Sequence, residues 1–213
     1  TFLEDLQAVA GVNACKIFVG FDRPWWRDQG IQHGRTSTDL PLRQCYYFGT
    51  EGEQEGADPE NTNSLLMAGY NDGTSVDYWE GYQPTSYIDH LLGHTPIAAH
   101  DNTVPSAMLE EIHRQLELIH GCKVPEPYTA HFQDWRSDPY GGGWHAWQIH
   151  SKRVEVMKRM RKPVEHLPVY ICGEAYSNTH GWAQGALNSA ELVCQEQLGL
   201  PAIDCLPEGH LLD

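Results

Sequence analysis

The sequence predicts an α+β chain, with short strands in the first part and helices becoming prominent after residue 105. Two observations carry this prediction: three apolar, β-favouring runs stand between turn-rich stretches, and two later segments repeat apolar residues at helical spacing. The chain has 213 residues, of which 40% are hydrophobic and 20% are charged. It is therefore long enough to bury the core of one domain or of two small ones.

The three expected strands lie at residues 16–21, 44–49 and 64–71. Each run is short, apolar and rich in β-branched or aromatic residues. The stretch 22–39 is rich in Gly, Asp, Arg and Trp, and the stretch 50–63 is acidic with few apolar residues. Both stretches are predicted to be surface loops.

The clearest helix begins near Ser106, where Met108, Leu109, Ile112, Leu116 and Ile119 recur at helical spacing. Ser106 is the expected N-cap and Gly121 the expected stop. Residues 128–135 then alternate as in a strand, and residues 138–143 end in three glycines that allow the backbone to approach a ligand closely.

Residues 152–162 hold six of the 14 basic residues of the chain. A solvated helical face explains such a run, and a patch for an anion or a partner is the alternative. Residues 169–173 are expected to form a buried strand. A helix follows, in which Ala183, Ala186, Leu187, Ala190, Val193 and Leu198 share a face, before Gly199 and Pro201 end it. The N-terminus of this helix, reached through a short loop, is a predicted site for an anion or a polar cofactor.

Charge, hydropathy and cysteine content bear on the partners and the compartment of the protein. With 14 basic and 29 acidic residues the net charge is −15, which disfavours nucleic acid and anionic membranes as partners. No apolar run approaches the roughly 18 residues of a membrane helix. The six cysteines stand at long spacings without a CxxC pair, and we expect free thiols, which favour a reducing compartment such as the cytoplasm; secretion stays open.

Familiar catalytic and metal motifs are missing from the sequence. Of the 12 histidines, His145, His150, His166 and His180 lie in the C-terminal third and are the candidates for a metal site. They do not form an HExxH or a two-His-plus-carboxylate pattern, so we predict no metal site. The nucleophile pattern GxSxG and the phosphate loop GxxxxGK[ST] are also lacking.

The strongest signal is the stretch 173–186, GEAYSNTHGWAQGA. It resembles the C-terminal flavin signature of the flavin-dependent amine oxidase family, especially its L-amino-acid oxidase branch. Further segments occur in the order and approximate spacing of that family's C-terminal half: KIF at 16–18, Trp26, TSTDLPLRQCYY at 36–47, and residues 135–143. The resemblance covers about residues 12–198.

The resemblance implies a two-domain, interleaved fold. Residues 1–160 would form part of a substrate-binding domain with a mixed sheet and helices. Residues 161–200 would supply the last strand and helix of a Rossmann-like FAD domain, and residues 201–213 would form a tail.

The resemblance also implies a cofactor site for FAD. Gly173 and Glu174 would lie by its ribityl and pyrophosphate region, although Glu174 could instead be a helix-leading acid. The backbone at Trp182 and Ala183 and the helix start up to Ala186 would face the flavin pyrimidine edge. Trp135, with Tyr140 and Gly141 to Gly143, would pack along the flavin ring. Where the covalent monoamine oxidases have a cysteine, this chain has Trp144, so we expect the FAD to be non-covalent.

For the substrate, an L-amino acid, the resemblance implies that Trp182 and Tyr47 form the walls of the site. The Tyr47 hydroxyl would bind the carboxylate, and the Gly181 carbonyl would accept from the amine. Tyr46 points to the opposite face of its strand, so one of the two tyrosines lines the pocket and the other packs. For Trp25, Trp26 and Trp79, and for Asp77 and Glu80, packing and solvation explain more than a substrate pocket does.

Three parts of the family pattern are missing. These are a GxGxxG dinucleotide fingerprint, a carboxylate-clamping arginine of the first half, and a lysine just upstream of the KIF strand that holds a water near flavin N5. Because the chain also opens on Thr1, we expect a fragment or processed subunit, completed by the N-terminal half and assembled into a homo-oligomer.

The function that the resemblance implies is FAD-dependent oxidative deamination of an L-amino acid to a 2-oxo acid, ammonia and hydrogen peroxide. The alternatives are an amino-acid 2-monooxygenase, a polyamine or monoamine oxidase, and a non-catalytic interaction module.

Overall fold

The computed structural model describes residues 2–82, 104–137 and 142–203. The chain forms two compact units, which are described separately. The first unit comprises residues 1–12 and 143–213, and the second comprises residues 13–142. The chain thus leaves the first unit, builds the second and returns to the first. The units begin and end at other residues than the expected domains, whose limits stay a prediction.

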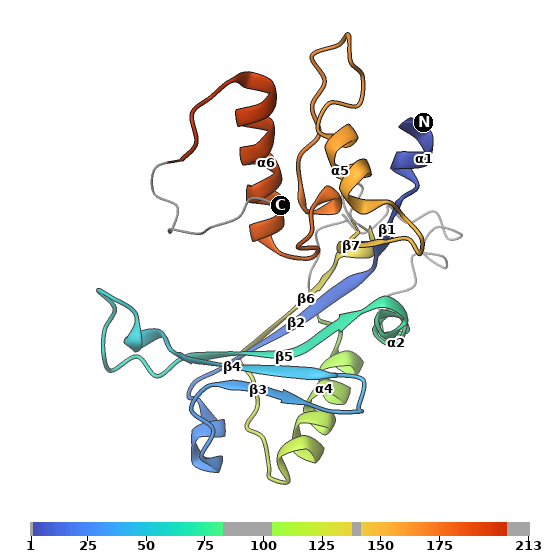
Figure 1. Ribbon diagram of the computed structural model, residues 1–213. Helices are drawn as coiled ribbons and strands as arrows, with labels where there is room; N and C mark the ends of the chain where they lie inside the picture. Colours follow the sequence, from blue (N-terminus) through green and yellow to red (C-terminus); the bar gives the residue numbers. More distant parts are fainter. Residues whose placement is uncertain (1, 83–103, 138–141, 204–213) are drawn as a thin grey trace, which may run out of the picture. The chain divides into compact units, whose positions relative to one another are not determined.

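The second unit is built on a five-stranded sheet of order β3-β4-β5-β2-β6 (Figure 1). Its strands are β2 (Ala14–Phe21), β3 (Gly34–Ser37), β4 (Gln44–Thr50), β5 (Ser64–Asp72) and β6 (Thr129–Asp134). The four predicted strands are confirmed to within two residues at each end, whereas β3 lies in a stretch predicted to be a loop. Every pairing between these strands is antiparallel, so the described residues do not contain the parallel pairing that a mixed sheet requires.

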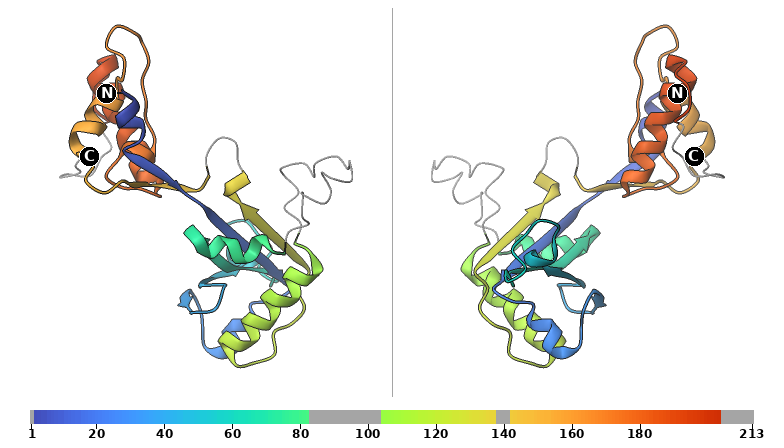
Figure 2. Two further views of the ribbon diagram at one scale, coloured as in Figure 1. Left: turned by 90° about the vertical axis from the view of Figure 1, so that its right-hand side faces the viewer. Right: turned by 90° about the vertical axis from the view of Figure 1, so that its left-hand side faces the viewer.

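Helix α4 (Ser106–His120) covers one face of this sheet, as Figures 1 and 2 show. The helix is the one that the sequence predicts, and Gly121 ends it in the left-handed conformation with φ of 63°. The N-cap position is occupied by Pro105 rather than Ser106. The buried side chains of α4 and of the strands form one core, which includes Met108, Ile112, Leu116, Ile17, Val19, Leu66 and Phe132. Each such side chain contributes about 1.5–3 kcal/mol on burial, so this contact is the main source of stability in the unit.

Tryptophan packing completes the core of the second unit. Trp25 and Trp26 lie in the short helix η1 (Trp25–Gln29), Trp79 lies in α2 (Asp77–Glu80), and all three are 0–3% exposed. Packing therefore explains these residues. Asp77 and Glu80 are exposed and form ion pairs with Arg136, of 3.5 and 2.8 Å.

The first unit pairs β1 (Val9–Val12) with β7 (Trp144–Trp147) and carries the helices α1 (Phe2–Leu6), α5 (Arg153–Met160) and α6 (Ala183–Leu198). Helix α5 confirms the helix expected in the basic stretch. It buries Val156, Met157 and Met160, while Arg159 donates two hydrogen bonds of 2.7 Å to Asp5. This ion pair holds the pKa of the Asp5 carboxyl below its usual value. In the described parts of the chain, no helix has both the length and the apolar character needed to cross a membrane.

Two expectations about the C-terminal region are wrong. Residues 169–173 are not a strand, and Val169 is 45% exposed. A buried strand needs neighbours that satisfy its backbone groups, and none of the described residues pairs with this segment. In α6, the residues buried are Gly185, Asn188, Ser189 and Val193, whereas Leu187 and Leu198 of the predicted apolar face are 65% and 52% exposed.

The cysteines that the structure describes, Cys15, Cys45, Cys122, Cys172 and Cys194, are free, as expected; Cys205 lies outside the described residues. Burial raises the pKa of both Cys15 and Cys45 to about 12. Since the thiolate is the reactive form, these two are packing residues.

Candidate functional site

A turn at residues 173–182, in the first unit, leads into α6 and carries three of the six predicted cofactor residues: Gly173, Glu174 and Trp182. Gly173 has φ of 138°, and a Cβ added to it would meet nothing within 4 Å. Its N–H donates to the Ser189 hydroxyl at 2.8 Å, and that hydroxyl is 3.0 Å from the Gly173 carbonyl. Ser189 therefore fixes the start of the turn against α6 while one side of Gly173 stays open.

Glu174, at the start of the short helix η5 (Glu174–Tyr176), has a carboxylate with two partners inside the first unit. One oxygen is 2.5 Å from His145 Nδ1, and the other accepts from the Gly181 N–H at 2.8 Å. Because an ionised carboxylate can only accept, Nδ1 carries the proton of this contact. The carboxylate thus holds strand β7 and the end of the turn together.

Gly185 brings α6 very close to the same turn. A Cβ at this position would lie 2.2 Å from the Ser177 hydroxyl and 2.4 Å from the Thr179 carbonyl oxygen. Ser177 is itself 2% exposed. Only glycine allows this approach, so the turn at residues 173–182 and helix α6 form one packed element.

The N-terminus of α6 is exposed. Trp182 is the N-cap residue, its side chain makes no capping hydrogen bond, and it is 71% exposed. Gly181 and Ala183 are also exposed, and Ala186 is half-buried. The first N–H groups of a helix lack partners within it and carry the positive end of the helix dipole. The open side of Gly173, the exposed indole of Trp182 and these donors fit the acceptor-rich, planar ring and the phosphates of FAD.

A second set of predicted residues lies in the second unit, on the sheet face that carries Lys16. Lys16 pairs with Tyr70, and its Nζ lies 5.1 Å from the Tyr70 ring centroid and 5.7 Å from that of Trp135. Tyr46 and Phe18 both pair with Met67, which places them on the same face. We call Lys16, Tyr46, Tyr70 and Trp135 the Lys16 cluster.

Tyr70 is the member of this cluster with a perturbed hydroxyl. Its partial burial, and then the negative charge of Asp72, raises its pKa. The group therefore stays protonated at neutral pH and can donate a hydrogen bond. A cation between two aromatic rings, beside the protonated Tyr70 phenol, is suited to a planar or anionic ligand.

Tyr47 points to the opposite, α4 side of the sheet. It is 3% exposed, and its hydroxyl lies 2.8 Å from Thr36 Oγ1 and 2.7 Å from His120 Nε2. Burial raises the pKa of Tyr47 to about 12. Of the two neighbouring tyrosines, Tyr47 is thus the one that packs and Tyr46 lies on the Lys16 side. The role of Tyr47 towards a substrate stays a prediction that mutation has to test.

His120 ties this hydroxyl to α4 and makes stability depend on pH. Its Nδ1 lies 2.7 Å from the Leu116 carbonyl, which can only accept, so Nε2 is the unprotonated nitrogen that accepts from Tyr47.

Burial lowers the pKa of His120 below its usual value. Its contribution to stability is therefore complete above about pH 6.5, the pKa of the unfolded chain, and falls as the pH drops below it. We expect urea denaturation to show a larger loss of stability between pH 7.5 and 5.5 in the wild type than in His120→Gln, which cannot titrate. Equal losses in the two proteins would contradict this account.

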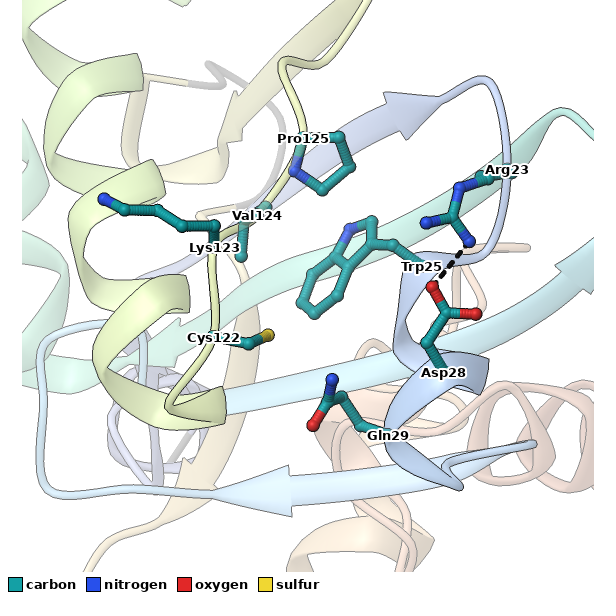
Figure 3. A pocket seen from close by; sticks show the side chains of 8 residues that line it. All are labelled: Arg23, Trp25, Asp28, Gln29, Cys122, Lys123, Val124 and Pro125. Carbon is teal, nitrogen blue, oxygen red and sulfur yellow. Dashed lines mark ion pairs between the residues drawn. The ribbon is translucent and has the colours of Figure 1, made fainter.

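A cavity of about 250 Å³ lies in the second unit. Its lining residues come from η1, from the segment just before it and from the segment after α4 (Figure 3). Trp25 and Cys122 line it, and an ion pair of 2.7 Å between Arg23 and Asp28 borders it. Apart from Trp25, none of its lining residues was considered for a site. In the described part of the chain, no group of three or more His, Cys, Asp or Glu residues could hold a metal ion.

Sequence reasoning missed Lys16, Tyr70 and His145. Lys16 was noted only as the start of the KIF run, and its strand partner could have been found only from the register of β2 with β5. His145 was considered only as a metal ligand. Of the glycine-rich segment, Gly142 and Gly143 have φ of 108° and 115°, while Tyr140 and Gly141 lie outside the described residues.

Comparisons with known proteins identify the family of the chain. The family model described as flavin containing amine oxidoreductase matches residues 2–198. Aplysianin-A of Aplysia kurodai is 29% identical over 89% of this chain and 33% of its own length. An L-amino-acid oxidase of Siganus canaliculatus is 28% identical over 88% of the chain and 31% of its own length, and achacin of Lissachatina fulica is 23% identical over 92% and 36%.

The chain thus spans about a third of the length of these relatives. The match covers both units, and it includes the turn at 173–182, the α6 N-terminus and the Lys16 cluster. The chain belongs to the flavin-containing amine oxidoreductase family, which uses FAD.

Proposed function

We propose that the protein carrying this chain catalyses FAD-dependent oxidative deamination of an L-amino acid to a 2-oxo acid, ammonia and hydrogen peroxide. The observation that supports this most is the exposed, uncapped N-terminus of α6 with Trp182 at 71% exposure, inside the segment that matches the family. Exposing an indole to water leaves a large apolar surface unburied. Beside helix N–H groups, such an indole can pack against a flat, polar ring.

In the first unit, we assign the cofactor to Gly173, Glu174 and the start of α6 from Ala183 to Ala186. When bound, FAD supplies the redox chemistry and accepts the electron pair removed from the substrate. The N-terminus of α6 carries roughly half a positive charge, which stabilises negative charge on a reduced flavin. The carbonyl of Gly181 accepts from the substrate amine, and Trp182 orients the substrate.

In the second unit, the Lys16 cluster is a better candidate for substrate and flavin contacts than the buried Tyr47. Trp135 packs along the flavin ring, as the sequence predicts, and Lys16 lies 5.7 Å from the Trp135 ring centroid. An ammonium at this place can bind a water or an anionic group. We assign the substrate carboxylate to the Tyr70 hydroxyl, with Tyr46 beside it, and keep Tyr47 as the competing candidate.

A visible absorbance spectrum of the purified protein tests the proposal. Flavin bands that bleach when L-amino acids are added without oxygen, and return with air as peroxide forms, would support it. Trichloroacetic acid precipitation would leave a non-covalent FAD in the supernatant. Bleaching by simple amines would favour a monoamine or polyamine oxidase, and an amide product with CO2 would favour a 2-monooxygenase. A protein that stays colourless with added FAD would contradict the proposal and favour an interaction module.

Replacing Trp182 with alanine should raise KM and lower kcat together, with FAD retained. Removing an aromatic wall worth about 1.5–3 kcal/mol should lower kcat/KM about 10- to 100-fold. Ile149→Ala, a change of another exposed side chain in the same unit, is the control and should leave kinetics unchanged. Unchanged kinetics in Trp182→Ala would remove this residue from the site.

A further inference from the structure

His145 lies next to the turn at 173–182 but belongs to another element of the first unit. It stands in β7, where it pairs with Gly11 of β1, so its backbone is held by a strand and not by the turn. Its side chain is 31% exposed and that of Glu174 is 21% exposed. At 2.5 Å, the contact between Nδ1 and the Glu174 carboxylate is a short charge-assisted hydrogen bond.

The second oxygen of Glu174 transmits this contact to the end of the turn. It accepts from the Gly181 N–H, which sits at a residue with φ of 73°. A Cβ on Gly181 would be 3.6 Å from Trp144, the neighbour of His145 in β7, so the peptide also rests on that strand. The Gly181 carbonyl and the Trp182 backbone follow directly. Their placement therefore depends on where His145 holds the carboxylate.

Other groups near this carboxylate are fixed in different ways. His180 stacks on Trp147 with ring centroids 5.2 Å apart, and its Nε2 lies 3.0 Å from the Ala175 carbonyl. Burial lowers the pKa of His180, which keeps it neutral at physiological pH. His180 thus braces the middle of the turn. The hydrogen-bonded link from β7 to the Gly181 end runs through His145 and Glu174, beside the packing of Gly181 on Trp144.

We propose that His145 is a positioning residue, which orients the Glu174 carboxylate so that the Gly181 peptide and Trp182 are held in the geometry that the reaction needs. The inference rests on the proposed function for its kinetic consequence, but the contact itself can be tested without flavin. The contact with Glu174 requires a hydrogen-bond donor at the position of Nδ1. We therefore expect a side chain that keeps this donor to replace the imidazole ring.

The matched variants are His145→Asn and His145→Leu. Asparagine places an N–H donor at the position of Nδ1, whereas leucine has the same branched shape without a donor. The first measurement is hydrogen exchange of the Gly181 amide in the protein without added substrate. Losing a charged hydrogen bond worth about 1.5–3 kcal/mol should speed exchange by about 10- to 100-fold in the leucine variant, and asparagine should restore protection.

The second measurement is steady-state kinetics of the flavin-loaded enzyme. A misplacement of about 1 Å can cost on the order of 100-fold, so we expect kcat/KM to fall 10- to 100-fold in His145→Leu and to stay within about threefold of wild type in His145→Asn. Thermal unfolding checks that both variants are folded. If the leucine variant does not fold, His145→Ala with and without added imidazole replaces it.

Two results would overturn the inference: unchanged Gly181 exchange in the folded leucine or alanine variant, or an asparagine variant as impaired as the leucine one. Trp182→Ala is measured in parallel. If that variant keeps wild-type kinetics while the Gly181 exchange responds to His145, the proposed site fails and the positioning contact stands. If Trp182→Ala is impaired and His145→Leu changes neither readout, only the role of His145 fails.

Discussion

Gly185→Ala will lower the free energy of unfolding by about 1–3 kcal/mol, the usual cost of inserting a group into a packed space. Alanine is the better helix former by about 1 kcal/mol, so helix propensity alone predicts the opposite sign. The added Cβ would lie 2.4 Å from the Thr179 carbonyl oxygen, a backbone atom, and 2.2 Å from the Ser177 hydroxyl. A rotamer change can move the hydroxyl, but only a backbone shift can move the carbonyl. The clash therefore outweighs the gain in propensity.

Urea denaturation of the wild type and of Gly185→Ala measures this loss in the free energy of unfolding. Gly11→Ala is the matched control, because a Cβ at Gly11 in β1 would meet nothing within 4 Å. Since the turn carries the predicted cofactor residues, we also expect weaker FAD retention in Gly185→Ala. A Gly185→Ala protein as stable as wild type would show that α6 and the turn are not packed as described.

Tyr70→Phe will lower kcat/KM, whereas Tyr47→Phe will lower the free energy of unfolding. If Tyr70 binds the substrate carboxylate, removing its hydroxyl costs a hydrogen bond to a charged group, about 1.5–3 kcal/mol, and lowers kcat/KM about 10- to 100-fold. The folded state should be little changed. Tyr47→Phe instead removes the hydroxyl between Thr36 and His120, at 2.8 and 2.7 Å, and we expect a loss of stability of roughly 1–3 kcal/mol with kinetics near wild type.

Steady-state kinetics with several L-amino acids and urea denaturation of both variants provide the two readouts. The paired design matters because the sequence assigns the carboxylate to Tyr47, whereas the Lys16 cluster points to Tyr70. A large kinetic loss in Tyr47→Phe with wild-type kinetics in Tyr70→Phe would reverse our assignment.

Elements whose pattern is local were predictable from sequence. The apolar spacing from Met108 to Leu116 and the glycine at 121 define a helix whatever it packs against, and α4 begins and ends as expected. The three apolar runs likewise became β2, β4 and β5. The flavin signature was recognisable because its glycines, Glu174 and Trp182 are adjacent in the chain.

Other features depended on partners far away in the sequence. The segment 169–173 has a strand-like composition, but a strand also needs neighbours, and the described residues do not supply them. The short strands β1 and β7 form although their composition does not predict a strand. They have a weak pattern and form because residues 9 and 147 meet across the chain.

The sequence by itself determined the family, the strands β2, β4, β5 and β6, and the helices α4, α5 and α6, since these depend on residues near one another in the chain. Only the tertiary structure decided which tyrosine of the 46–47 pair is buried, that Lys16 lies beside Tyr70 and Trp135, and that His145 holds Glu174. The physical reason is that strand register and side-chain contacts across 29 residues or more, as between His145 and Glu174, arise from packing and leave no local pattern.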